Sequence, residues 1–191
     1  MPELEFPGRE KLIAALDDAI ATGDAPTVAE AVRVALERLL RDAAFRLPDH
    51  VLQPAADHYA RRQIHASAAH GYTVIAMAWG PGQGTPLHDH AGQWCVEGVV
   101  QGRLEVTEYA LLERDGERFR FKPRPGALAQ AGSTDKLLPP DEHHVIRNPD
   151  SDGIAVSLHV YQREMDRCHV FAPDPRGGGW YLRSPRDLGV D

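Results

Sequence analysis

The short apolar segments that recur after Gly71 constrain the fold of this 191-residue chain more than any other feature. They are rich in β-branched and aromatic side chains, and Gly, Pro, Asn and Asp separate them. Gly102 can supply the positive φ of a tight turn between two of them. Many short strands without intervening helices are typical of an antiparallel barrel or jelly roll. The predicted strands span residues 72–79, 94–100, 103–110, 117–121, 145–148, 153–161, 168–172 and 180–183.

The N-terminal third has helical periodicity. Apolar residues recur on one helical face over residues 10–21, at Leu12, Ile13, Leu16 and Ile20. A second helix is predicted to begin with a capping box formed by Thr27 and Glu30 and to run to about Phe45. A third, shorter helix is predicted over residues 55–62.

These elements predict a mainly β protein that forms a single structural domain. Residues 1–70 would form an N-terminal helical segment, which would pack on a jelly-roll β-barrel of residues 71–191. The length of the chain is sufficient for one domain with a full core.

The composition argues against several classes of partner. The net charge of −7 and the scattered Lys and Arg residues disfavour nucleic-acid binding, and the densest basic run, residues 114–124, is expected to cover the solvent face of a strand and turn. No window reaches the ~18 apolar residues of a membrane span, and the first residues lack the apolar core of a signal peptide. Two cysteines, Cys95 and Cys168, do not form a disulfide scaffold. We therefore expect a cytoplasmic monomer without a nucleic-acid or membrane partner.

A His-x-His pair, His88 and His90, is the first candidate for chemistry. Side chains alternate along a strand, so both imidazoles can reach one metal ion while Asp89 faces the other way. A third ligand must come from another strand, where His143 and His144 are adjacent candidates. Neighbouring residues of a strand point to opposite faces, so only one of the two is expected to point inward.

A second polar pattern lies on the predicted strand 153–161. Ser157, His159 and Tyr161 share one face of this strand, and the residues between them are apolar. The strand is therefore expected to be buried on both faces. Polar side chains inside a barrel need hydrogen-bond partners or a ligand.

No carboxylate follows the His-x-His pair closely. Residues 93–95 are Gln-Trp-Cys, and the nearest acid is Glu97. Three neutral imidazoles leave the metal its full positive charge and open coordination positions, which suits a non-haem Fe(II) that binds an anionic, chelating substrate together with O₂. A thiolate suits such a site especially, because coordination strongly lowers the pKa of a thiol.

With these features the sequence resembles cysteine dioxygenase and the wider thiol dioxygenase family of cupins over residues 59–171. The matching segments are Trp79-Gly-Pro-Gly-Gln-Gly-Thr-Pro-Leu-His-Asp-His90, Cys95 with the Gln101-Gly102 turn, His144-Val-Ile-Arg-Asn148, Ala155-Val-Ser-Leu-His-Val-Tyr161 and Cys168-His169. The resemblance implies that His88, His90 and His144 hold one Fe(II). It favours His144 over His143 because the family pattern has an asparagine four residues after the ligand, as Asn148 is here.

The resemblance also implies roles for the remaining site residues. Ser157, His159 and Tyr161 would form a hydrogen-bonded triad that holds the tyrosine hydroxyl near the iron. Arg61, two residues after Tyr59, would bind the substrate carboxylate, with Arg62 as the alternative.

Three further positions belong to the same expected site. Met77 and Trp79 would contact the substrate together with Tyr59 and Arg61. Cys95 stands where the animal enzymes have the cysteine that is joined to the active-site tyrosine as a thioether. A buried free cysteine is the alternative for this position.

The function expected from the resemblance is Fe(II)-dependent addition of O₂ to the thiol of L-cysteine, which gives cysteine sulfinic acid. Arg61 favours cysteine over 3-mercaptopropionate, because relatives that prefer the latter tend to carry glutamine there. Trp94 and Glu97 differ from the animal enzymes, which leaves another small mercaptocarboxylate open. A zinc or manganese cupin isomerase and a non-enzymatic sensor are the alternatives from other classes.

Overall fold

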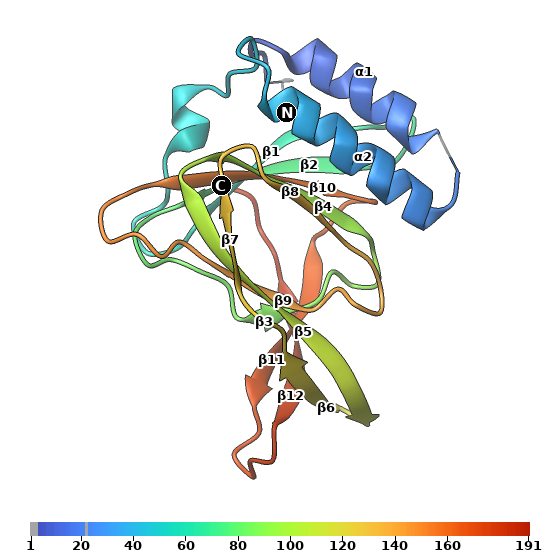
Figure 1. Ribbon diagram of the computed structural model, residues 1–191, viewed down its shortest axis with the longest axis vertical. Coiled ribbons are helices and arrows are strands. Elements are labelled where there is room, and N and C mark those ends of the chain that lie inside the picture. The colour runs from blue at the N-terminus through green and yellow to red at the C-terminus, as the bar shows by residue number, and fades with distance from the viewer. Residues whose placement is uncertain (1–3, 22) are drawn as a thin grey trace.

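The computed structural model describes residues 4–21 and 23–191 (Figure 1). Met1, Pro2, Glu3 and Thr22 lie outside the described residues. The first three belong to the N-terminal segment in which the sequence predicts no signal peptide. The helices are α1 (Arg9–Ile20), α2 (Ala25–Leu40) and the short 3₁₀ helix η1 (Asp49–Leu52). The strands are β1 (Ala60–Ala66), β2 (Thr73–Trp79), β3 (Leu87–His88), β4 (Cys95–Gln101), β5 (Arg103–Asp115), β6 (Arg118–Pro123), β7 (Ala127–Gln130), β8 (Thr134–Leu137), β9 (His144–Arg147), β10 (Ala155–Tyr161), β11 (Arg167–Pro173) and β12 (Trp180–Asp187).

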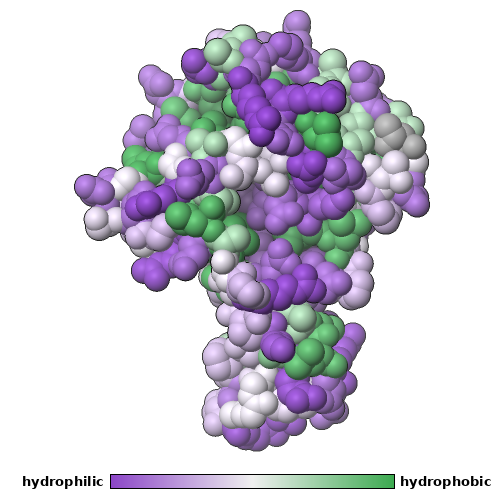
Figure 2. All heavy atoms as spheres, in the orientation of Figure 1, coloured by the Kyte–Doolittle hydropathy of each residue, from purple (hydrophilic) through white to green (hydrophobic). Residues whose placement is uncertain are grey.

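The strands form two antiparallel sheets, and the mainly β jelly roll predicted from the sequence is confirmed. One sheet has the strand order β1-β2-β10-β4-β8, and the other has the order β6-β12-β11-β3-β9-β5-β7. The far ends of β5, β6, β11 and β12 project beyond the two-sheet body (Figure 1). Hydrophilic side chains cover most of the face drawn in Figure 2.

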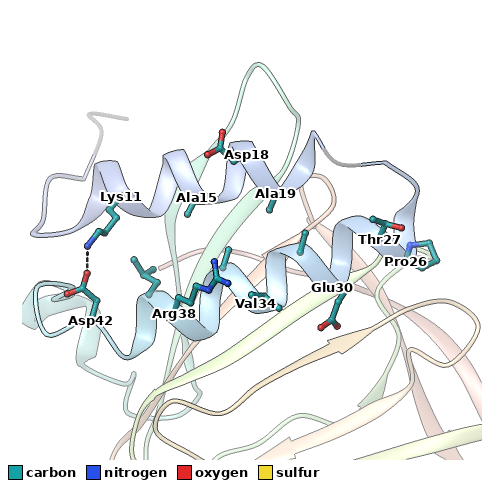
Figure 3. Close-up of a pocket in the computed structure, with 13 residues that line it drawn as sticks. Lys11, Ala15, Asp18, Ala19, Pro26, Thr27, Glu30, Val34, Arg38 and Asp42 are labelled. Atoms are coloured by element: carbon teal, nitrogen blue, oxygen red, sulfur yellow. Dashed lines mark hydrogen bonds and ion pairs between the residues drawn. The ribbon is translucent and has the colours of Figure 1, made fainter.

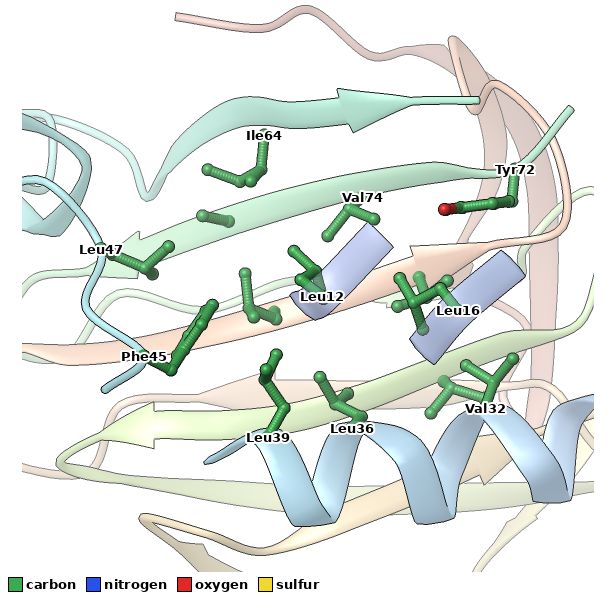
Figure 4. Packing of buried hydrophobic residues seen from close by; sticks show 14 of the residues in the cluster. Leu12, Leu16, Val32, Leu36, Leu39, Phe45, Leu47, Ile64, Tyr72 and Val74 are labelled. Carbon is green, nitrogen blue, oxygen red and sulfur yellow. The ribbon is translucent and has the colours of Figure 1, made fainter. Parts of the chain in front are cut away.

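The helices α1 and α2 pack on the outer face of the five-stranded sheet (Figure 1). Leu12 and Leu16 of α1, Leu36 of α2 and Val74 of β2 are almost fully buried in one apolar cluster (Figure 4). Burial of one such leucine contributes roughly 1.5–3 kcal/mol. Gly98 of β4 permits the close approach, because a Cβ atom there would lie 2.7 Å from a methyl carbon of Leu40.

The central strands of this sheet, β2, β10 and β4, are buried on both faces. Alternate residues point toward the helices, as Ala76 and Leu158 do, or into the space between the sheets, as Met77 and Ser157 do. The polar residues of β10 therefore lie inside the barrel, as the sequence predicted.

Several local predictions were wrong. The second helix begins at Ala25, and Asp24 caps it by accepting a hydrogen bond from the Thr27 N–H at 3.0 Å. Thr27 therefore lies in the first turn, and the capping box with Glu30 does not form. The helix ends at Leu40 rather than near Phe45.

The predicted helix over residues 55–62 is also wrong. Residues 55–59 are irregular, and β1 begins at Ala60. Antiparallel pairing with β2 supplies the hydrogen bonds of this segment, so tertiary context overrides its local propensity.

The eight predicted strands are present with shifted ends. β3 is the short observed part of the strand expected at His88 and His90. β1, β7 and β8 were not predicted: the start of β1 lies in the segment expected to be helical, and the four-residue strands β7 and β8 show no clear alternation. Gly102 has φ +70° and makes the expected turn between β4 and β5. Within residues 4–21 and 23–191, no helix combines the length and apolar content that crossing a membrane requires.

Candidate metal centre

His88, His90 and His144 gather between the two sheets. One ring nitrogen from each lies within 4.8 Å of the others. His88 is the last residue of β3 and pairs directly with His144, the first residue of β9. The spacing argument for His90 was wrong in detail, because β3 ends before this residue. Instead, a hydrogen bond from the His90 N–H to Oε2 of Glu142, at 3.0 Å, fixes the backbone there.

The three imidazoles are prepared to act as neutral ligands. Burial lowers the pKa of His88 to about 4 and holds the pKa values of His90 and His144 well below the usual range. Nδ1 of His88 donates to the Pro86 carbonyl at 3.1 Å, so its Nε2 keeps a free lone pair. Within the described part of the chain, the ring nitrogens of His90 and His144 have no hydrogen-bond partner. Buried imidazoles that lack such partners fit a metal ion.

The neighbours of this group point away from it. The ring of His143 packs against Phe121 and Phe171, with centroids at 4.8 and 5.3 Å, so this histidine faces a different cluster. Asp89 accepts a hydrogen bond from the His169 N–H at 2.8 Å and lies 2.9 Å from Nδ1 of the same residue. The side chains of His143 and Asp89 therefore both point away from the three histidines, as the sequence predicted.

Glu97 is a buried acid beside the cluster, and the sequence analysis gave it no role. Its Oε1 lies 3.8 Å from Nδ1 of His144, and its Oε2 lies 3.4 Å from Nδ1 of His159. Burial raises the pKa of Glu97 to about 8. The available signal was its position two residues after Cys95, which places both on one face of β4.

Ser157 and His159 form part of the expected triad. The indole N–H of Trp79 donates to Oγ of Ser157 at 2.9 Å, and this Oγ lies 2.8 Å from Nε2 of His159. The indole can only donate, so the serine hydroxyl keeps its own proton and can donate it to Nε2 of His159. Burial lowers the pKa of His159 to about 3, so its ring is neutral.

Tyr161 is not joined to this chain of hydrogen bonds, and that part of the triad prediction was wrong. Its ring stacks with that of His159 at 6.1 Å, but no hydrogen bond links the two residues in the described structure. The ring also lies 5.9 Å from that of His90. Trp79 instead extends the chain of hydrogen bonds at its serine end.

Cys95 lies directly opposite Tyr161 where β4 pairs with β10. Both residues are buried, and burial holds the pKa of the Cys95 thiol well above its usual range. The two side chains share the interior face of the sheet, close to the histidines.

The expected substrate residues line one cavity beside the histidines. Tyr59 stacks on Trp79 with ring centroids 4.4 Å apart, and Met77, on β2 like Trp79, lines the same cavity. The buried guanidinium of Arg61 donates to the carbonyls of Gly189, at 2.9 Å, and Met165, at 3.4 Å. This cavity also contains the side chains of His88, His159 and Tyr161.

Arg62 does not reach this cavity. Its guanidinium donates to the carbonyls of Val51 and Gln53, at 3.3 and 2.7 Å. Successive residues of β1 point to opposite faces, and only Arg61 points inward.

A larger groove, of about 1000 Å³, lies between α1 and α2 and shares no residue with the histidine cavity (Figure 3). An ion pair between Lys11 and Asp42 closes one end of this groove. Its walls are helix side chains, many of them small or apolar, so the chemistry-bearing residues lie in the barrel instead.

Comparison with known proteins agrees with this geometry. The sequence profile described as cysteine dioxygenase type I matches residues 53–174, well over half of the chain. The chain belongs to the cysteine dioxygenase type I family. Human cysteine dioxygenase type 1 is 29% identical over 111 residues, and the zebrafish (Danio rerio) protein is 28% identical over 107 residues. In both cases the match covers 56% of this chain and 52% of the relative, so the chain spans about half the length of these curated relatives.

Two solved structures match the chain at lower sequence identity. A protein of Thermus thermophilus superimposes with a TM-score of 0.45 and 20% identity, over 61% of this chain and 94% of that protein. A cupin 2 conserved barrel domain protein of Salinispora arenicola has a TM-score of 0.42 and 17% identity, over 63% of this chain and 89% of that protein.

Proposed function

We propose that this protein is an Fe(II)-dependent thiol dioxygenase that adds both atoms of O₂ to the thiol of a small carboxylate-bearing thiol. One observation carries the proposal: three neutral histidines, two of them without hydrogen-bond partners for their ring nitrogens among the described residues, gather inside the barrel of a cysteine dioxygenase family member, and no carboxylate belongs to the group. L-cysteine, which would give cysteine sulfinic acid, is the substrate that the family suggests. Another mercaptocarboxylate, such as 3-mercaptopropionate, is the alternative.

His88, His90 and His144 would hold the iron. Fe(II) bound by three neutral ligands supplies open coordination positions and the redox chemistry that joins O₂ to a thiolate. Because no carboxylate ligand would neutralise the ion, its positive charge would attract an anionic substrate. We propose Cys95 and Tyr161 as the residues nearest to the reacting atoms.

The other residues would position the substrate. Arg61 would exchange its two neutral carbonyl acceptors for the substrate carboxylate, because a charged acceptor makes the stronger hydrogen bond. Trp79, Met77 and Tyr59 would exclude water from the part of the cavity where the substrate thiol binds. Ser157 would hold His159 neutral and fixed in orientation beside Tyr161.

Oxygen uptake tests the proposal directly. Iron-loaded protein should consume one O₂ for each cysteine or 3-mercaptopropionate oxidised, and mass spectrometry should find the sulfinic acid. Zinc-loaded protein should consume none. Thiol binding without oxygen uptake in the iron-loaded protein would favour a sensor, and a redox-neutral conversion that zinc supports would favour an isomerase.

The proposed function includes the cellular compartment in which the enzyme acts. Cys95 and Cys168 are both free and buried, which suits a reducing compartment such as the cytoplasm. We propose that the enzyme acts there as a monomer.

A further inference from the structure

Arg186 of β12 is a second cationic residue at the substrate cavity. It pairs directly with Cys168 of β11, and directly opposed residues of antiparallel strands have their side chains on the same face. Cys168 is buried in the apolar cluster inside the barrel. The Arg186 side chain therefore leaves the strand on the face that carries the metal centre.

Strand register relates Arg186 to the histidine cluster. Val170, two residues along β11 from Cys168, pairs directly with His88. Arg186 and His88 line the same cavity as Arg61. The positive charge of Arg186 also acts on Tyr59, where it is the main influence opposing the rise in pKa that burial causes.

The charges lining this cavity are unbalanced. The cavity has two guanidinium groups, those of Arg61 and Arg186, and no carboxylate side chain among the described residues that line it. The imidazoles that line it, those of His88 and His159, are neutral and add no negative charge. A ligand in this space therefore meets an excess of positive charge even before a metal ion is counted.

Arg186 differs in this respect from other arginines of the same sheet. Arg118 pairs with Asp174 at 2.9 Å, and Arg183 pairs with Glu117 at 2.7 Å. Within residues 4–21 and 23–191, Arg186 has neither an ion pair nor a hydrogen bond from its guanidinium. Its five N–H donors are available to an anion that enters the cavity.

We propose that Arg186 is a second carboxylate-binding residue, and that the preferred substrate is a small thiol with two carboxylate groups. The inference rests on the proposed thiol dioxygenation and refines the choice of its substrate. Arg61 takes one carboxylate, Arg186 takes the other, and the thiolate is directed to the histidine cluster. A substrate with an ammonium group in place of the second carboxylate would bring a third positive charge to the same cavity.

Binding requires a movement at the cavity mouth. The free volume of the cavity is about 20 Å³, close to that of one water molecule. Leu188 lines it, and Asp191 holds the adjoining segment through hydrogen bonds with both the N–H and the carbonyl of Arg61, each at 2.7 Å. A dicarboxylate that displaces residues 188–191 replaces the carbonyl of Gly189 with a charged acceptor at Arg61 and also reaches Arg186.

A matched set of thiols tests the proposal. The set consists of 2-mercaptosuccinate, which has two carboxylates, and 3-mercaptopropionate and 2-mercaptopropionate, which each lack one of them. L-cysteine completes it. With iron-loaded protein, kcat/KM for 2-mercaptosuccinate should exceed that for each monocarboxylate by about tenfold, because one hydrogen bond to a charged group has roughly this effect.

Substitutions assign the effect to one residue. Arg186→Gln should lower kcat/KM for 2-mercaptosuccinate about tenfold and that for 3-mercaptopropionate by much less, so that the preference disappears, whereas Arg186→Lys should keep part of it. Arg183→Gln, on the same strand but paired with Glu117, is the control and should change neither value. Comparable kcat/KM for all four thiols, or an equal loss for all of them in Arg186→Gln, would overturn the proposal.

A binding measurement separates this inference from the proposed function. Calorimetric titration of metal-free protein with succinate and with butyrate involves no thiol and no oxygen. Succinate should bind about tenfold more tightly than butyrate, and Arg186→Gln should abolish the difference. If succinate binds more tightly in this way but no thiol is oxidised, only the dioxygenase proposal is contradicted. Equal binding of succinate and butyrate would overturn the role of Arg186.

Discussion

Cys95 and Tyr161 lie directly opposite one another on the antiparallel strands β4 and β10, and both side chains are buried on the interior face of the sheet. Directly opposed residues have Cβ atoms about 4.5–5.5 Å apart, so a thiol can reach the edge of a tyrosine ring. Sequence resemblance implied this proximity, and the strand register provides it. The rigid pairing of two central strands holds it in place.

We predict that Cys95 and Tyr161 become joined as a thioether during turnover. Joining a thiol sulfur to a ring carbon removes two hydrogen atoms, with O₂ as oxidant, so intact mass should fall by about 2 Da. The linked peptide should resist dithiothreitol, and Cys95→Gly should abolish it while retaining measurable activity. Iron-loaded protein that completes many turnovers without a linked peptide would refute the prediction and leave Cys95 as a buried free thiol.

The adjacent histidines should respond oppositely to substitution. His144→Ala removes one of the three ring nitrogens that lie within 4.8 Å of one another, so it should abolish most iron binding and oxygen uptake. His143 packs against Phe121 and Phe171, so His143→Ala should keep the iron and lower only the unfolding temperature. Iron content measured by atomic absorption distinguishes the two variants, and loss of iron in His143→Ala alone would reverse the ligand assignment.

Arg61 and Arg62 offer a similar matched pair. Arg61→Gln should raise KM for carboxylate-bearing thiols by tens to thousands of fold, because removal of one charged hydrogen-bonding partner costs about 2–5 kcal/mol. Arg62→Gln should leave KM near that of the native protein, since the Arg62 side chain binds the carbonyls of Val51 and Gln53 outside the cavity. Equal turnover of cysteamine and cysteine by native protein would argue against any carboxylate clamp.

Glu97 should strengthen metal binding through His144. A carboxyl group beside the second ring nitrogen of a ligand orients the imidazole, and its loss typically lowers metal affinity about 10–100-fold. Glu97→Leu should therefore weaken Co(II) binding, measured by titration of the visible absorption bands, by about tenfold. Asp135→Asn is the control. Asp135 of β8 lies directly opposite Glu97 of β4 in the strand pairing, but its side chain is exposed. Unchanged Co(II) affinity in Glu97→Leu would show that the 3.8 Å contact has no role in metal binding.

The buried Glu142 should make stability depend on pH. Burial raises its pKa to about 7, against about 4.3 in an unfolded chain. A raised pKa stabilises the fold fully below the unfolded value, and this contribution disappears as the pH rises through about 7. Metal-free wild-type protein should therefore lose roughly 2–5 °C in Tm relative to Glu142→Gln between about pH 5 and pH 8. A constant difference between the two proteins over this range, measured by calorimetry, would contradict the prediction.

The class of fold and most of the candidate chemistry follow from local patterns in the amino-acid sequence. Alternation on β10 predicted that Ser157, His159 and Tyr161 share an interior face, because side chains of a strand point alternately to its two sides. The helical stripe that contains Leu12 and Leu16 likewise predicted a helix that packs by one face. These features are local, since they depend on the geometry of one element.

Which residues meet across elements depends on how the strands are arranged in space. His90 is positioned by Glu142 rather than by a strand, Trp79 donates to Ser157, and Arg186 faces the cavity through its pairing with Cys168. The first two contacts join segments far apart in the chain, and the third depends on the register of two consecutive strands. Strand register and burial create them, and a single sequence shows neither, because no local periodicity records which strand lies beside which.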